Sequence, residues 1–127
     1  DAQYCGTTPP PGSGSFENAT DVPIPDAGPP VTSAVTVTGK DGNAPAALKV
    51  TVDIKHTYRG DLVIDLVAPD GSAYRLKPAS SGDAADNVSE TYTVNASTEA
   101  ANGTWQLKVQ DIYSADVGFI DLWRLTF

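Results

Sequence analysis

The chain has 127 residues, which is enough for one domain with its own hydrophobic core and no need of disulfide bonds. Its 16 acidic and 8 basic residues give a formal net charge of −8, which argues against nucleic-acid binding and against docking on a membrane through a polybasic patch. The same acidic surface suits divalent cations that prefer oxygen ligands, as calcium does.

The first segment, residues 1–15, is predicted to be an interdomain linker or tail. Pro9, Pro10 and Pro11 favour a stiff extended stretch, and a flexible Gly/Ser run follows them. The single cysteine, Cys5, either pairs with a cysteine of another domain or is a spare thiol. Neither a signal peptide nor an apolar run near the roughly 20 residues of a membrane helix is seen. Because a linker needs a domain on its far side, we expect the C-terminal part of a longer, secreted protein.

From residue 16 to residue 127 the pattern is one strand after another. Apolar and polar residues alternate in several segments, whereas residues 62–67 form an almost continuous apolar run, typical of a central strand covered on both faces. Asp70-Gly71 predicts a tight hairpin turn. The predicted strands are Glu17–Ile24, Thr32–Thr38, Leu48–Ile54, Leu62–Val67, Ser72–Lys77, Ser89–Val94, Thr104–Gln110 and Phe119–Phe127.

No segment shows a 3.6-residue period with helix caps, so we expect residues 16–127 to form an all-β domain. About eight short, mainly antiparallel strands joined by turns indicate a β-sandwich, and this number of strands suits a jelly roll. Trp105 and Trp123 lie in phase with apolar neighbours, which predicts core positions for both rather than a platform for sugars.

Three groups of motifs stand out along the chain. They are Ile24-Pro25-Asp26 with Val31–Ser33 near the start, His56–Leu66 with Ala68–Ser72 in the middle, and Asn102–Val109, Gln110-Asp111, Asp116–Gly118 and Leu122–Leu125 near the end. In this order, over residues 17–127, they resemble the P domain (homo-B domain) of the proprotein convertase family. Ile120-Asp121 departs from the family pattern, which more often has a small or amide residue there.

The resemblance implies a jelly-roll β-sandwich without an active site of its own. In convertases such a domain packs on the catalytic domain and supports its folding, stability and calcium dependence. In bacteria it follows the catalytic unit of secreted serine peptidases and of some zinc metallopeptidases. We therefore expect a monomeric, secreted accessory domain whose partner is a catalytic peptidase domain in the same polypeptide. The alternative is an independent extracellular module that binds carbohydrate or protein, because a jelly roll hosts many functions.

The sequence lacks the residue patterns that the common classes of hydrolase need. The only histidine, His56, ends a predicted strand beside a turn, and we interpret its ring as hydrogen-bonded within that turn. A serine hydrolase would need a nucleophile motif such as G-x-S-x-G, which is absent from the sequence, and a zinc site would need several His or Cys ligands. A glycosidase with paired carboxylates would need aromatic residues free to stack on sugars. The domain is therefore predicted to be non-catalytic.

Calcium is the cofactor that the sequence favours, because carboxylates gathered at loop ends repel one another unless a cation lies between them. If the first and last strands run antiparallel as neighbours, Asp26 comes close to Asp111 and Asp116, which form the first expected cluster. Asp21 and Asp61 are weaker members. The competing interpretation is that these aspartates are solvated loop residues that end strands and aid solubility.

Overall fold

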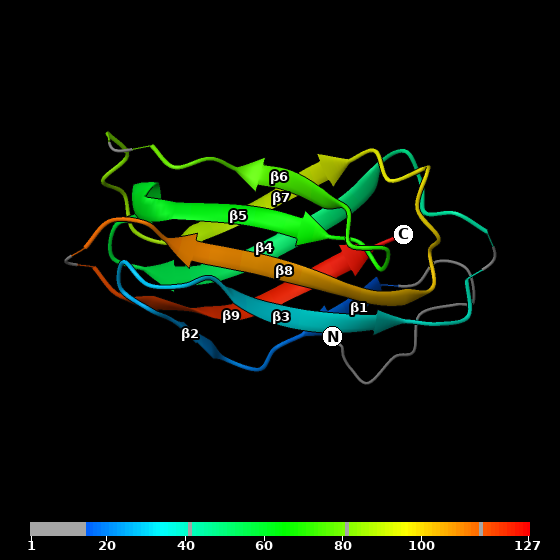
Figure 1. The fold of residues 1–127 in the computed structure, drawn as a ribbon, viewed down its shortest axis with the longest axis horizontal. Helices are drawn as coiled ribbons and strands as arrows, with labels where there is room; N and C mark the ends of the chain where they lie inside the picture. Colours follow the sequence, from blue (N-terminus) through cyan, green and yellow to red (C-terminus); the bar gives the residue numbers. More distant parts are fainter. Residues whose placement is uncertain (1–14, 41, 81, 115) are drawn as a thin grey trace.

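The computed structural model describes residues 15–40, 42–80, 82–114 and 116–127, and it is a sandwich of two antiparallel sheets (Figure 1). The predicted all-β sandwich is thus confirmed. The predicted linker lies outside the described residues except for Ser15, where the first strand begins. The elements are β1 Ser15–Asn18, β2 Val22–Ile24, β3 Val31–Val37, β4 Leu48–His56, the 3-10 helix η1 Arg59–Asp61, β5 Leu62–Val67, β6 Ala73–Lys77, β7 Val88–Val94, β8 Gly103–Asp111 and β9 Gly118–Thr126.

The two sheets bring distant parts of the chain side by side. One sheet has the order β1-β9-β4-β7, with β2 also paired to β9, and the other has the order β3-β8-β5-β6. The first strands run antiparallel to the last, and Ile24 lies opposite Gly118. This is the neighbour relation from which the aspartate cluster was predicted. The jelly-roll connectivity stays a prediction.

The first predicted strand, residues 17–24, is divided into β1 and β2. The side chain of Asn18 explains the break: its oxygen accepts a hydrogen bond from the Thr20 amide at 2.8 Å, and its nitrogen donates to the carbonyl of Ala34 at 2.8 Å. An Asn side chain that takes up a backbone amide two residues on makes a turn that competes with strand pairing. The described residues therefore form nine strands, where eight were predicted.

The core lies between the sheets and contains both tryptophans. Trp105 and Trp123 are fully buried, as predicted. Each indole N–H is satisfied: Trp105 donates to the carbonyl of Ala101 at 2.9 Å, and Trp123 donates to the hydroxyl of Ser33 at 3.0 Å. A platform of exposed tryptophans, which the carbohydrate-binding alternative would use, is therefore not built from these two residues.

Candidate metal centre

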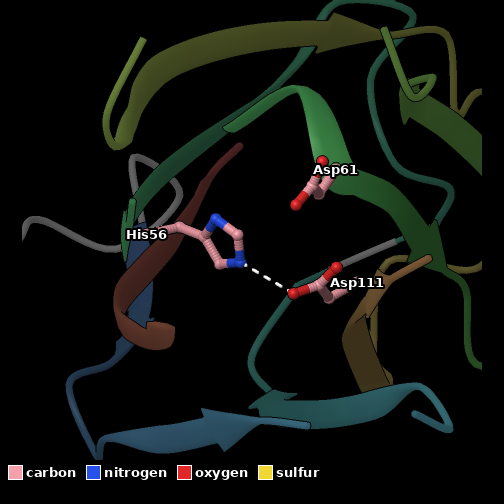
Figure 2. Close-up of side chains that lie close together, drawn as sticks. All are labelled: His56, Asp61 and Asp111. Carbon is pink, nitrogen blue, oxygen red and sulfur yellow. Dashed lines mark hydrogen bonds and ion pairs between the residues drawn. The ribbon is translucent and has the colours of Figure 1, made fainter. Parts of the chain in front are cut away.

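A buried polar cluster lies at the end of the sandwich where β4 ends, η1 leads into β5, and β8 ends (Figure 1). It consists of His56, Asp61 and Asp111, all buried, and each offers one ligand atom within 4.8 Å of the others. Figure 2 shows the Asp61 carboxylate directed toward the space between His56 and Asp111. Three polar side chains gathered out of water need partners, because an unsatisfied buried group destabilises the fold.

Helix η1 places Asp61 in this cluster. The Gly60 amide donates to the carbonyl of Asp83 at 3.0 Å, and the Gly60 carbonyl accepts from the Ser80 amide at 2.8 Å. A Cβ atom at Gly60 would lie 2.0 Å from the Ser80 carbonyl oxygen, so the close approach requires glycine here. The Asp61 carbonyl then accepts from the Ile112 amide at 3.0 Å, and this bond fixes η1 beside the end of β8.

His56 is held in one tautomer by its two hydrogen bonds. Its Nδ1 accepts from the backbone amide of Tyr58 at 3.0 Å, so the ring proton of the neutral form is on Nε2. Nε2 lies 3.0 Å from Oδ2 of Asp111 and donates to it. The predicted hydrogen bond of this ring within the turn is thus present. The ring has no free lone pair in this state and acts as a donor rather than as a metal ligand.

The carboxylates of Asp111 and Asp61 differ in the number of hydrogen bonds that they accept. Asp111 accepts from His56 and, through Oδ1, from the amide of Tyr113 at 3.1 Å. Oδ2 of Asp61 is buried and has no hydrogen-bond partner in the described part of the chain. Burial raises the pKa of the Asp61 carboxyl above its ordinary value; the charges of Asp111, Asp116 and Asp26 raise it further, and His56 acts in the opposite direction.

The structure brings most of the predicted aspartates to this end of the sandwich, with a different centre from the one expected. Asp61 and Asp111 form the buried heart, while Asp116 and Asp26 lie farther out and act on Asp61 through their charge. Asp116 accepts a hydrogen bond from the Thr57 hydroxyl at 2.8 Å. Asp21 instead shares a hydrogen bond with Asp121, and that contact is the main cause that raises the pKa of Asp121.

The sequence predicts only a structural role for His56 within its turn and does not indicate its bond to Asp111. The two residues are 55 positions apart, and no local pattern links them. The one usable signal was that both belong to motifs of the same family resemblance.

Comparison with protein families gives one match over most of the chain. The family described as "Proprotein convertase P-domain" matches residues 45–127. These residues run from just before β4 to the end of the chain, and they include all three members of the buried cluster.

Several curated bacterial proteins resemble the chain. It is 65% identical over 117 residues to a "Transglutaminase-activating metalloprotease" of Streptomyces mobaraensis, covering 91% of this chain and 15% of the relative. It is 58% identical over 123 residues to "Leupeptin-inactivating enzyme 1" of Streptomyces exfoliatus, covering 96% of this chain and 28% of the relative. A "Calcium-dependent protease" of Nostoc is 34% identical over 114 residues, covering 83% of this chain and 17% of the relative. The chain thus spans less than a third of each relative.

Among solved structures, the serine protease of Aeromonas sobria shares the fold, with a TM-score of 0.58 and 19% sequence identity over 98% of this chain and 28% of that one. The described residues contain no helix long and apolar enough to cross a membrane.

Proposed function

Because the chain belongs to the proprotein convertase P-domain family, we propose that it is a non-catalytic accessory domain of a secreted peptidase. In this role it supports the folding and stability of a catalytic domain in the same polypeptide. The two Streptomyces relatives support this proposal, since the chain accounts for only 15% and 28% of their lengths. A domain that stabilises its neighbour must itself stay folded, so the interactions that stabilise this domain contribute to its function.

We propose further that calcium stabilises the domain by binding at Asp61 and Asp111. The observation that carries this is the buried, unpartnered Oδ2 of Asp61 next to a second carboxylate. A cation between the two carboxylates would offset both their repulsion and their desolvation. Asp116 and Asp26 are the outer candidates, because their charges act on Asp61. The Nostoc relative's description as a calcium-dependent protease agrees with this choice of ion.

The donor set favours calcium over zinc. Zinc sites are built from His nitrogen and Cys sulfur, whereas calcium takes carboxylate and carbonyl oxygens. His56 Nδ1 accepts a hydrogen bond from the Tyr58 amide, and Nε2 donates its proton to Asp111. Ligation of zinc through Nδ1 would break the first bond, and ligation through Nε2 would break both. What the centre offers a metal in this state is oxygen.

The same bonds leave His56 unsuited to nucleophilic catalysis. A catalytic histidine must accept a proton from a serine, threonine or cysteine nucleophile. Among the described residues, the partners of the ring are the Asp111 carboxylate and the Tyr58 amide, and neither is a nucleophile. The ring is also buried, which separates it from any peptide in solution.

Calcium is expected to raise the melting temperature of the isolated chain. An ion that binds only the folded form adds about 2.7 kcal/mol at a concentration 100 times its dissociation constant. For a domain of this size that corresponds to roughly 10 °C. Thermal melts in excess calcium and in EDTA measure it, and a melt in zinc chloride is the matched control that should not shift. Identical midpoints in calcium and EDTA would refute the calcium part of the proposal.

The accessory role is tested by exchanging domains. In the S. mobaraensis metalloprotease, the region that matches this chain is replaced by residues 1–127, giving an exchange protein. We expect it to retain activity after heating far longer than the same protease with the region deleted, because the domain stabilises its neighbour. A deletion form as heat-resistant as the exchange protein would contradict an accessory function.

A further inference from the structure

The large hydrophobic side chains that are exposed in the described structure all lie on one loop. They are Ile112, Tyr113 and Val117, which are 40%, 46% and 64% exposed. The loop joins β8 to β9 at the end of the sandwich that holds the candidate metal centre (Figure 1). Single exposed apolar residues are ordinary, but a concentration of them on one loop of an acidic protein marks an interaction surface. We call these three residues the apolar loop patch.

A hollow of about 330 Å³ adjoins the patch. Val117 and Phe119 line one part of it, and Thr57 and Asn87 line another. Val117 therefore belongs to both features, so the patch and the hollow form one continuous surface. A raised apolar loop beside a hollow can engage a partner of complementary shape, with anchor residues on both sides.

The described residues at the two ends of this loop are held by hydrogen bonds within the domain. The Ile112 amide donates to the Asp61 carbonyl at 3.0 Å, and the Tyr113 amide donates to Asp111 at 3.1 Å. At the other end, the Thr57 amide donates to the Val117 carbonyl at 3.3 Å. These bonds tie the patch to the same residues that form the candidate metal centre. A surface ordered in advance loses less entropy when it binds.

We infer that the apolar loop patch is the surface through which this domain packs on the catalytic domain of its own polypeptide. This rests on the proposed accessory function. The matching region spans only 15% and 28% of the two Streptomyces relatives, so a large covalently attached neighbour is the expected occupant. Attachment through a short linker gives an effective concentration in the millimolar range, at which a small patch suffices.

Charge defines the partner's chemistry more closely. Asp86 lines the hollow and Asp116 lies on the loop, while Lys55 is the one lysine or arginine among the residues that line the hollow. With a net charge of −8 on the chain, the complementary surface has an apolar centre bordered by lysine or arginine.

The attachment point does not prevent this contact. Ser15, the first described residue, pairs with Thr126, whereas the patch lies beyond Gly118 at the other end of β9. A nine-residue strand is about 30 Å long. The 14 residues before Ser15 can span up to about 46 Å when extended, which is longer than the strand that separates the two ends.

Hydroxyl-radical footprinting of the exchange protein tests the inference. We expect oxidation of Tyr113 to fall several-fold relative to the isolated chain, because the catalytic domain covers it. Tyr92, half-buried on β7, is the matched control and should be oxidised equally in both. Unchanged oxidation of Tyr113 in a heat-resistant exchange protein would overturn the docking surface and leave the accessory role standing. Protection of Tyr113 in the isolated chain at rising concentration would also overturn it, since the occupant would then be a second copy.

A variant completes the test. Ile112→Ser, Tyr113→Ser and Val117→Ser together should lower the heat resistance of the exchange protein toward that of the deletion form. Thr36→Ala, on the exposed face of β3, should leave it unchanged. A cooperative thermal melt of the isolated triple variant in EDTA reports whether the domain still folds. A folded triple variant that protects the protease fully would refute the inference.

Discussion

Replacing Gly118 by alanine is expected to lower the free energy of unfolding by about 3 kcal/mol. Gly118 opens β9 and pairs with His56 of β4 on one side and with Ile24 of β2 on the other. A Cβ atom there would lie 2.1 Å from the carbonyl oxygen of Lys55 and 2.8 Å from both Cα and Cδ2 of His56. The nearest of these atoms is backbone, so the clash is relieved only if β4 and β9 move apart.

The effect should reach the candidate metal centre, because the same movement displaces the ring of His56 from Asp111. Urea denaturation of Gly118→Ala measures the stability, and its calcium shift measures the damage to the site. Gly82→Ala is the matched control, since a Cβ at Gly82 would meet nothing within 4 Å and its backbone needs no left-handed conformation. Equal stability of the two variants would mean that β4 and β9 are not as close as described.

Most of the fold follows from patterns that act over a few residues. Alternation predicted β4, β8 and β9 to within two residues at each end, because a half-buried strand must alternate to bury one face. The Asp70-Gly71 turn is also present, with Gly71 at φ +92°. The break between β1 and β2 was missed because it depends on Asn18 bonding to Ala34, a contact with another strand that no local pattern shows.

The candidate site was predictable in place but not in detail. The antiparallel arrangement of the first and last strands brought Asp26, Asp111 and Asp116 to one end of the molecule, as argued from the sequence. Which carboxylates are buried there depends on η1, whose path is set by the packing of Gly60 on Ser80 and Asp83. Asp61, predicted as a weaker member, is therefore buried in the cluster together with Asp111.

The variant Asp61→Asn is expected to be more stable than the wild type in EDTA at neutral pH, by about 1–3 kcal/mol, and to lose the calcium shift. Asparagine keeps the shape of the side chain and removes the buried charge beside Asp111. The asparagine side-chain amide can donate a hydrogen bond to the Asp111 carboxylate, so fewer buried polar atoms at position 61 lack a partner. Without the Asp61 carboxylate, calcium should no longer bind the folded form more tightly than the unfolded form, so it should not stabilise the variant.

The pH dependence gives the prediction a second, independent readout. The pKa of Asp61 is raised in the folded chain, so the folded form holds this proton more tightly than the unfolded one. The ionised Asp61 carboxylate destabilises the folded form by its full amount at pH values above the folded pKa. This destabilisation disappears at pH values below the unfolded pKa of about 3.9. In EDTA the advantage of Asp61→Asn should therefore be largest at neutral pH and shrink as the pH falls toward 4. Comparing the two proteins cancels the contributions of the carboxylates that do not interact with Asp61.

Glu90→Gln is the matched control for the loss of one negative charge. Glu90 is exposed on β7, on the edge of its sheet, so its removal should change neither the stability in EDTA nor the calcium shift by a measurable amount. If Asp61→Asn keeps the full calcium shift, the ion binds elsewhere. If the stability of Asp61→Asn also depends on pH as that of the wild type does, then the Asp61 carboxylate of the wild type has hydrogen-bond partners other than those described. If Asp61→Asn loses both the calcium shift and the wild-type pH profile while Glu90→Gln keeps them, the ion binds at Asp61. Both substitutions remove one negative charge, so a general effect of net charge would change them equally.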